Sequence, residues 1–321
     1  MEQLSQAYLE KTVLQSKPFS ADGKVKETVP GINSTVEGSL GLAVCTVDGK
    51  EFEAGLTDYR FTLQSISKVI NLMIALQDAG PEAVFKQVGM EPTSQLFDSV
   101  KGLTELGGHK PFNPFIDEGA IAITSLITGK NSEERFNRII KLLRKITGNA
   151  KLRMNEAAYE EAKRDSSKSY ALAYYLESES VIENGKVEEA LDLYFRGLSI
   201  EVNALELARI GAFFARDGYM NGEDEPLIKP DHISIMKALM LTSGLYNDSG
   251  KMAVQAGIPA KSGIGGGIVA AATGIMGIGI FGPALNAGGN STAGMEALKH
   301  LSRNFDLNIF KRSSFNPDKN T

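Results

Sequence analysis

The sequence contains few of the residues that form disulfides or bind metals. It has no tryptophan, one cysteine and three histidines in 321 residues. The lone Cys45 cannot form an internal disulfide, and the N-terminus has no basic segment followed by an apolar stretch, so we expect an intracellular, cytoplasmic protein. His109, His232 and His300 lie far apart, without the spacing of a metal site or of a Ser/His/Asp triad.

An excess of basic charge is also lacking. The 34 Lys and Arg residues face 39 Asp and Glu residues, which gives a net charge of −5 with both signs interspersed. No basic surface for nucleic acid is therefore expected. No charge occurs between Lys261 and Glu296, but glycines and Pro283 interrupt this stretch, which favours buried sheet over a membrane helix. We expect the partner to be a small molecule.

Apolar spacing predicts strands toward both ends of the chain and helices between them. We expect one domain, residues 1–321, of the α+β class. An antiparallel sheet flanked by helices (about 20–65 and 257–305) would meet a helical subdomain (about 66–255) at a cleft. The expected strands are 39–47, 50–55, 264–272 and 275–281, and the expected helices are 2–16, 61–79, 131–144, 154–163, 168–178, 187–197, 201–216, 231–241 and 290–304.

Ser65 and Lys68 are the first pair that could carry chemistry. They stand three residues apart in an expected helix, which places them on one face. A serine hydroxyl is a poor nucleophile until a base removes its proton, and a partly buried lysine can be that base. The Ser-x-x-Lys pattern alone is weak, because Ser234 and Lys237 repeat it on an ordinary amphipathic helix, where we interpret them as surface residues.

Lys261, in Lys261-Ser262-Gly263, strengthens the interpretation of the first pair. Ser-x-x-Lys with a downstream Lys-Thr-Gly is typical of β-lactamases and penicillin-binding proteins. Here the triplet opens the C-terminal strand pair, where such a strand belongs. The order of hairpin, Ser-x-x-Lys helix, helical insert and Lys-Ser-Gly strand therefore favours Ser65 as a nucleophile, with Lys261 as a further candidate catalytic residue.

A dinucleotide pattern also occurs by letter. Residues 277–282 read G-x-G-x-x-G, but they lie inside an expected strand and run into Pro283 instead of a helix. A dinucleotide-binding loop needs a helix directly after the glycines. We therefore interpret this segment as a strand, and the apolar surroundings of Cys45 indicate a core cysteine.

Six segments, in order and spacing over nearly the whole chain, resemble the bacterial glutaminases. The resemblance implies a β-lactamase-like fold that hydrolyses L-glutamine to L-glutamate and ammonia without a metal or other cofactor. It also implies a homodimer or homotetramer. The segments are FTLQSISKV (61–69), KPFNPFIDEGAI (110–121), LDLYFRGLSIEVNALELARIG (191–211), GLYNDSGKMA (244–253), GIPAKSGIGGGI (257–268) and GPALNAGGNSTAG (282–294).

The resemblance assigns roles to residues that match the family's letters. Ser65 would attack the side-chain amide of the substrate, and Lys68 would take the proton of Ser65. The oxyanion would lie between the backbone N–H groups of Ser65 and Ile264, which stands at the family's valine position. Tyr246 would donate a proton to the leaving ammonia or anchor the substrate, and Tyr194 would hydrogen-bond near the nucleophile.

The chain departs from the family where the amino-acid head group of the substrate is expected. An anion at Asp117 stands where the resemblance implies an amide that would meet the α-carboxylate. The glutamate that would pair with the α-ammonium is either missing or displaced by one position, to Glu161. Each lost hydrogen bond to a charged group costs roughly 1.5–3 kcal/mol. The family's Asn-Ala, Ser-Glu, Arg-Asn and Tyr-Ile-Pro are replaced by Asp117-Glu118, Glu161-Ala162, Lys168-Ser169 and Thr28-Val29-Pro30.

These departures lead to one hypothesis and three alternatives. We expect Asp117, Glu161 and Ser169 to bind the substrate together with the matching residues, with Asp117 or Glu161 taking the ammonium. One alternative is a hydrolase of a different small amide. Another is a hydrolase that interacts with β-lactams, which the lack of an export signal disfavours. The third is a catalytically silent homologue that acts as a metabolite sensor or as a partner in a hetero-oligomer.

Overall fold

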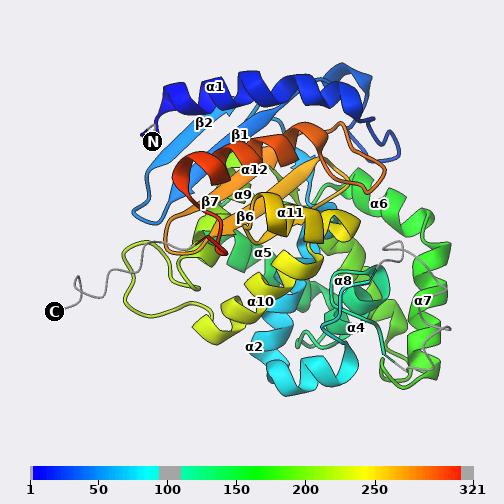
Figure 1. Cartoon of the computed structure of the whole chain (residues 1–321). Coiled ribbons are helices and arrows are strands. Elements are labelled where there is room, and N and C mark those ends of the chain that lie inside the picture. The colour runs from blue at the N-terminus through cyan, green and yellow to red at the C-terminus, as the bar shows by residue number, and fades with distance from the viewer. Residues whose placement is uncertain (1–2, 94–109, 312–321) are drawn as a thin grey trace.

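A five-stranded antiparallel sheet lies at the centre of the computed structural model, which describes residues 3–93 and 110–311 (Figure 1). The strand order is β2-β1-β7-β6-β5, so the N-terminal hairpin and the C-terminal strands form one sheet, as predicted. His109 lies outside the described residues. The strands of the sheet are β1 Gly41–Thr46, β2 Glu51–Gly55, β5 Ala260–Ser262, β6 Gly267–Ala272 and β7 Met276–Phe281.

The central strands are buried on both faces. In β1, Leu42 and Val44 belong to one apolar cluster, while Ala43 and Cys45 belong to the cluster on the opposite face. A strand covered on both faces reads as a continuous apolar run, which explains the sequence pattern of this segment. Cys45 is a core residue, as predicted, and its burial raises the pKa of the thiol.

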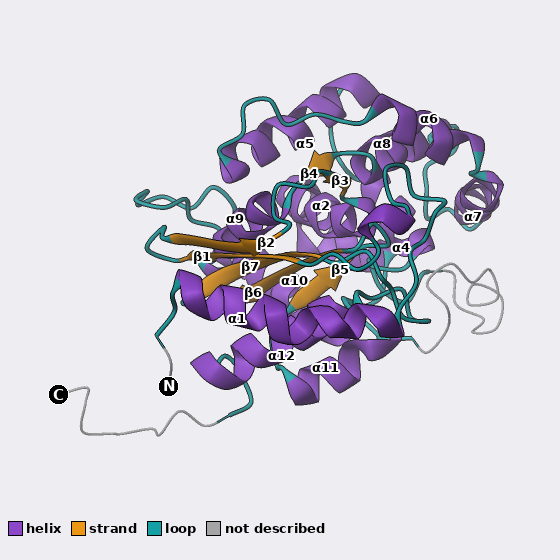
Figure 2. Ribbon diagram, turned by 90° about the horizontal axis from the view of Figure 1, so that it is seen from above, coloured by secondary structure: helices purple, strands orange, loops and turns teal. Residues whose placement is uncertain are grey.

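Helices cover both faces of the sheet (Figure 2). On one face α1 (Gln6–Ser16) packs against β2 and against α12 (Thr292–Phe305). On the other face α9 (Ala204–Ala215) packs against β1, β6 and β7. We expected α9 in the helical subdomain (about 66–255). The division of the chain into a sheet lobe and a helical lobe remains a proposal. The other helices are α2 Ser67–Gln87, α4 Asp117–Ser125, α5 Ser132–Thr147, α6 Glu156–Arg164, α7 Ser167–Ser178, α8 Val187–Leu198, α10 Pro230–Ser243 and α11 Ser249–Gln255.

Glycines allow α9 to lie close to the sheet. A Cβ atom on Gly277 would lie 1.8 Å from the backbone nitrogen of Ala212, and one on Gly279 would lie 1.9 Å from the carbonyl oxygen of Ala204. Neither distance can be accommodated without moving the helix. The G-x-G-x-x-G letters therefore belong to a strand that packs on a helix, which confirms their interpretation as sheet.

Two segments differ from their predicted helices. Phe61–Thr62 form β3, and Gln64–Ile66 form a 3-10 turn before α2 begins. β3 pairs antiparallel with β4 (Glu201–Val202), which lies within the predicted helix 201–216. The helix starts later because Asn203 and Glu206 form a capping box at the start of α9.

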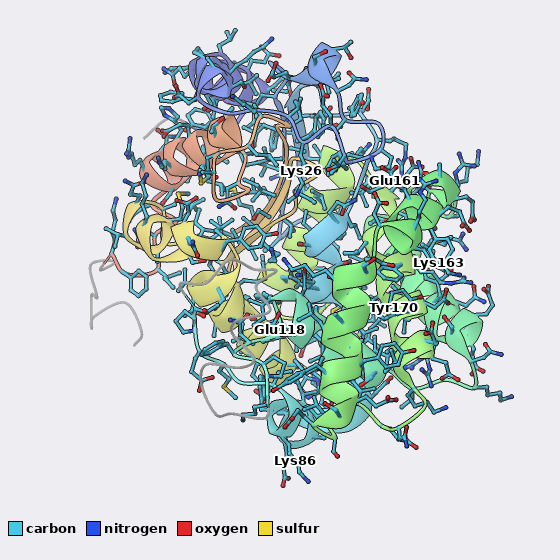
Figure 3. All side chains as sticks on the ribbon, turned by 90° about the vertical axis from the view of Figure 1, so that its right-hand side faces the viewer. Lys26, Lys86, Glu118, Glu161, Lys163 and Tyr170 are labelled. Atoms are coloured by element: carbon cyan, nitrogen blue, oxygen red, sulfur yellow. The ribbon has the colours of Figure 1, made fainter. Side chains whose placement is uncertain are left out.

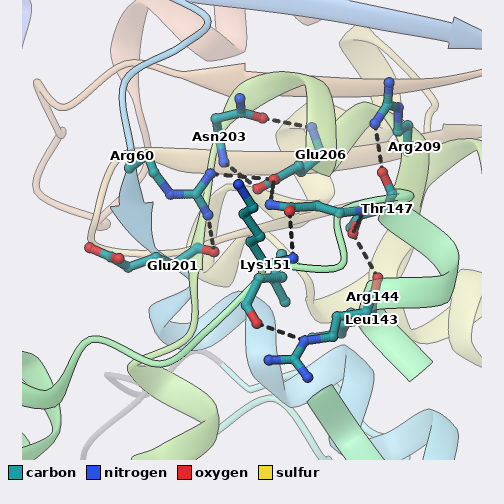
Figure 4. A network of polar contacts seen from close by, with 11 residues as sticks. Arg60, Leu143, Arg144, Thr147, Lys151, Glu201, Asn203, Glu206 and Arg209 are labelled. Carbon is teal, nitrogen blue, oxygen red and sulfur yellow. Dashed lines mark hydrogen bonds and ion pairs between the residues drawn. The ribbon is translucent and has the colours of Figure 1, made fainter. Parts of the chain in front are cut away.

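The Glu206 carboxylate also joins parts of the chain that are far apart in sequence (Figure 4). Its Oε1 accepts hydrogen bonds from Arg60 at 3.3 Å and from Asn149 at 2.6 Å.

The predicted cap of α5 is confirmed, since Asn131 accepts from the backbone N–H of Glu134. No helix within residues 3–93 or 110–311 is long and apolar enough to cross a membrane, and the uncharged stretch after Lys261 contains β6 and β7.

Candidate active site

Ser65 lies in the 3-10 turn between β3 and α2. The backbone N–H of Leu63 donates to the carbonyl oxygen of Ile200 at 2.8 Å, so the β3–β4 pair holds the entry to this turn. Gln64 has a φ of 48°, which is a strained conformation for a residue other than glycine. Its side chain donates to Thr62 Oγ1 at 2.9 Å. These contacts place the Ser65 hydroxyl at the start of α2, with the residue 7% exposed.

Lys68 is fully buried in the first turn of α2. Its Nζ donates to Oδ1 of Asp117 at 2.5 Å and to the carbonyl oxygen of Phe115 at 3.1 Å. The phenol of Tyr194, from α8, donates to the same Asp117 oxygen at 3.1 Å. A buried ammonium needs a counter-charge, and Asp117 at the start of α4 supplies it. We expected Asp117 at the substrate head group, but one of its oxygens is committed to Lys68 and Tyr194.

Tyr246 approaches Ser65 from the short turn before α11. Its hydroxyl makes a side-chain hydrogen bond with Ser65 and donates to the carbonyl oxygen of Ser262 at 3.4 Å. Tyr246 has a φ of 52°, and Ser249 supports this strained residue by donating to its carbonyl oxygen at 2.8 Å. The phenol is therefore placed between the Ser65 hydroxyl and the carbonyl oxygen of Ser262.

Lys261, on β5, is the second fully buried lysine of the site. Its Nζ donates to the carbonyl oxygen of Ser262 at 2.6 Å and lies 4.2 Å from the centroid of the Tyr246 ring. Burial lowers the pKa of Lys261 well below its usual range, and the positive charge of Lys68 lowers it further. Burial therefore favours the uncharged form of the Lys261 amine.

Both site tyrosines keep their protons at neutral pH. Burial raises the pKa of Tyr246, and burial together with the carboxylate of Asp117 raises the pKa of Tyr194. A protonated phenol can donate a hydrogen bond or a proton. Tyr194 donates to Asp117, and Tyr246 lies next to Ser65, where a leaving group would need a proton.

The turn that carries Ile264 packs directly against the nucleophile turn. A Cβ on Gly263 would lie 2.6 Å from the carbonyl oxygen of Leu63, so only glycine permits this approach. A cavity of about 530 Å³ opens beside the turn, lined in part by Lys24, Lys26 and Ile264. Its wall reaches the site, since a Cβ on the lining residue Gly289 would lie 3.8 Å from Ile264 and 3.7 Å from Tyr246. The cavity therefore lies beside the turn that carries Ile264, and Ser65 is not among its lining residues.

Asn290 is a residue of the site for which the sequence analysis predicted no role. Its Oδ1 accepts from Ser262 Oγ at 2.6 Å, and its Nδ2 donates to Leu245 O at 2.9 Å and to Asp248 at 2.8 Å. It thus ties β5 to the turn that carries Tyr246. The only available signal was its place in the segment GPALNAGGNSTAG.

Glu161 and Ser169 are not joined to the Ser65 cluster by any hydrogen bond or ion pair within the described ranges. They lie on α6 and α7, both are partly exposed, and Figure 3 shows Glu161 on α6 with Tyr170 on the neighbouring helix. Thr28 lies in an exposed loop before β1. Whether these three residues contact the substrate stays a prediction.

The second Ser-x-x-Lys pair is separate from this cluster. Ser234 is exposed, but Lys237 is only 8% exposed and forms an ion pair with Asp217 at 2.5 Å, so our interpretation of it as a surface residue was wrong. The difference arises because the Lys237 side chain is buried where α10 packs on the rest of the molecule, while its ammonium reaches the carboxylate of Asp217. His232 lies buried on the same helix, and His300 lies on α12.

The side chains of the Ser65 cluster lie on a β-lactamase-like fold and form the set that we expected for a hydrolase. It combines a buried serine at the start of a helix, a lysine one turn away, a tyrosine on the serine hydroxyl and a second lysine on the edge strand.

Comparisons with known proteins identify the family. The family model described as Glutaminase matches residues 23–310. Glutaminase 2 of Clostridium perfringens is 46% identical over 94% of this chain and 99% of its own length, and the glutaminase of Alkaliphilus oremlandii is 46% identical over 95% and 100%. The crystal structure of a Bacillus glutaminase in 4.3 M NaCl matches with a TM-score of 0.86 at 36% identity, over 95% of this chain and 99% of that one. The chain belongs to the glutaminase family.

One further structure shows a relative with a ligand. A Bacillus subtilis glutaminase was solved as a covalent complex with 5-oxo-L-norleucine, formed by reaction with 6-diazo-5-oxo-L-norleucine. It is 34% identical to this chain, with a TM-score of 0.83 over 95% of this chain and 99% of that one. The predicted fold and family are therefore confirmed.

Proposed function

We propose that this chain hydrolyses L-glutamine to L-glutamate and ammonia through an acyl-enzyme on Ser65. The observation that carries the proposal is the buried Ser65 hydroxyl. It is hydrogen-bonded to Tyr246 and lies one helical turn from Lys68, in a chain of the glutaminase family. The relative that forms a covalent complex with a glutamine-like ketone supports a covalent route.

The site residues divide the reaction into two balanced steps. In the first, Ser65 attacks the amide carbon while its proton passes to the uncharged form of Lys68. The N–H groups of Ser65 and Ile264 stabilise the oxyanion, and one such donor contributes roughly 10²–10³ in rate. Tyr246 gives a proton to the nitrogen, which leaves as ammonia.

In the second step water hydrolyses the ester and releases glutamate. Lys68 gives up the proton that it gained, and Tyr246 regains the proton that it lost, which restores the starting state. The reaction as a whole therefore consumes one water. The N–H of Ile264 donates to no described residue, which leaves it available to an oxyanion.

Recognition of the amino-acid head group is the part most open to change. Asp117 is engaged by Lys68 and Tyr194. Glu161 is therefore our candidate for the substrate ammonium, with Ser169 as its neighbour and Lys24 or Lys26 at the cavity for the α-carboxylate. Ammonia release across glutamine, asparagine and simple primary amides tests this assignment, since turnover of amides without glutamine turnover would favour the alternative substrate.

The role of Ser65 is tested by Ser65→Ala. We expect ammonia release from glutamine to fall by about 10³-fold or more, because no other group can form the acyl-enzyme. Ser234→Ala is the matched control, since it removes the exposed serine of the other Ser-x-x-Lys pair and should leave turnover unchanged. Retention of turnover by Ser65→Ala, with the protein folded, contradicts the acyl-enzyme proposal.

We also propose that the chain acts in the cytoplasm as a homodimer or homotetramer. Its single cysteine and its membership of the glutaminase family support these two points. Light scattering of the purified protein measures the mass of the assembly directly, and a monomer at working concentration contradicts the oligomer.

A further inference from the structure

Asp117 has contacts that are unusual for a substrate-binding residue. Its Oδ1 lies 2.5 Å from the Nζ of Lys68 and accepts a second hydrogen bond from Tyr194 at 3.1 Å. The Lys68 side chain is 0% exposed and that of Asp117 is 21% exposed, so water screens this ion pair little.

The site contains two buried amines that compete for one counter-charge. Lys68 has the carboxylate of Asp117 and the carbonyl oxygen of Phe115, whereas Lys261 has the carbonyl oxygen of Ser262 and the face of the Tyr246 ring. Burial lowers the pKa of Lys261, and the charge of Lys68 lowers it further. The carboxylate of Asp117 is in direct contact with Lys68.

Other ionisable groups lie on the elements packed around Lys68. Tyr194 from α8 and Tyr246 before α11 are protonated phenols, as their raised pKa values show. Glu118, next on α4, is buried and acts electrostatically on Tyr194. On α10, which also packs on α2, Lys237 is paired with Asp217. On α2 itself and on α5, Asp78 and Arg138 pair with one another.

We propose that Asp117 is a positioning residue that keeps Lys68 protonated in the resting enzyme and thereby sets the pH above which Ser65 is activated. The inference rests on the proposed amide hydrolysis, because it assigns a base to that reaction. Lys68 must lose its proton before it can accept the proton of Ser65. A carboxylate at 2.5 Å stabilises the charged amine and opposes that loss, so activity should rise only at a higher pH than an uncharged neighbour would permit.

The pH dependence of kcat for Asp117→Asn tests the proposal. Replacing the carboxylate by an amide removes the counter-charge but retains the size and a hydrogen-bond acceptor for Tyr194. We expect the acid side of the kcat profile to move to lower pH by about one unit or more, as expected when an opposite charge within hydrogen-bonding distance is removed. Asp117→Glu, which retains the charge, should return the profile most of the way toward that of the unmodified protein.

Asp58→Asn is the matched control, because it makes the same chemical change at an exposed residue. Its profile should coincide with that of the unmodified protein. A rise in KM for Asp117→Asn with no movement of the kcat profile overturns the proposal and assigns Asp117 to the substrate ammonium. A movement of equal size in Asp58→Asn also overturns it, since the effect would then follow net charge alone.

A second measurement separates this inference from the proposed function. Carbon-13 NMR of protein labelled at lysine Cε reports the protonation of each amine, and the Lys68 signal is identified by its loss in Lys68→Arg. We expect Lys68 to stay protonated to a higher pH in the unmodified protein than in Asp117→Asn. If glutamine yields no ammonia, the proposed function fails while this readout still tests Asp117. An unchanged Lys68 signal overturns the inference even if glutamine is hydrolysed.

Discussion

At the scale of single residues, the site depends on proton positions more than on the nucleophile alone. Ser65 contacts a phenol that burial keeps protonated, and one of the two buried lysines, Lys68, is paired with the carboxylate of Asp117. Tyr246 is the group that touches both the nucleophile and the edge strand. Its hydroxyl can therefore be removed as a direct test of proton delivery.

Tyr246→Phe should lower kcat for ammonia release by about 10²-fold or more, because a positioned general acid contributes roughly 10²–10⁴. The ring stays in place, so thermal unfolding should change little. Tyr174→Phe is the control, since Tyr174 is 49% exposed on α7 and donates to Glu188 away from the site. Full activity of Tyr246→Phe would show that the proton reaches ammonia by another route.

At the scale of elements, α9 lies in close contact with the sheet. Gly277 on β7 meets the backbone of α9, and β7 pairs with both β1 and β6. The same helix begins at the capping box that follows β4, and β4 pairs with β3 directly before the nucleophile turn. A shift of α9 would therefore be transmitted to the position of Ser65.

Gly277→Ala should lower the free energy of unfolding by about 1–3 kcal/mol or more, because overpacking a filled interface forces the backbone to move. Gly250→Ala is the matched control, since Gly250 lies in α11 with open space around its would-be Cβ, and alanine in a helix is favoured over glycine by roughly 0.5–1 kcal/mol. Chemical denaturation of both variants measures the difference. Equal stability of Gly277→Ala and the unmodified protein would contradict the close packing of α9.

The elements also show what the sequence could and could not predict. The four longer strands and the expected helices, apart from some of their first residues, follow from apolar spacing. β3 and β4 were not predicted, because a strand of two residues is too short to show an alternating apolar pattern. The ion pair between Lys68 and Asp117 joins residues 49 positions apart on different helices, and local patterns contain no information about such a contact.

At the scale of the whole molecule, charged pairs connect α2 to the helices around it. Besides Lys68, α2 carries Asp78, which accepts from the Arg138 guanidinium of α5 at 2.6 and 2.7 Å and from the Thr128 N–H at 2.8 Å. Burial alone would raise the pKa of Asp78, but the hydrogen bonds from Arg138 and Thr128 outweigh it and lower the pKa. The stability of the molecule should therefore depend on the ionisation of this carboxyl.

When folding lowers the pKa of an aspartate, its ionised form stabilises the native state. This contribution is complete at pH values above the pKa in the unfolded chain, about 3.9, and is lost as the pH falls through the pKa in the folded protein. Asp78→Asn should therefore be less stable than the unmodified protein by about 1–3 kcal/mol at pH 7, with a smaller difference near pH 3. Urea denaturation across this range measures both. Asp224→Asn, an exposed loop position, should show no such difference. A difference for Asp78→Asn that stays constant from pH 7 to pH 3 would mean that packing, and not the ionised pair, links α2 to α5.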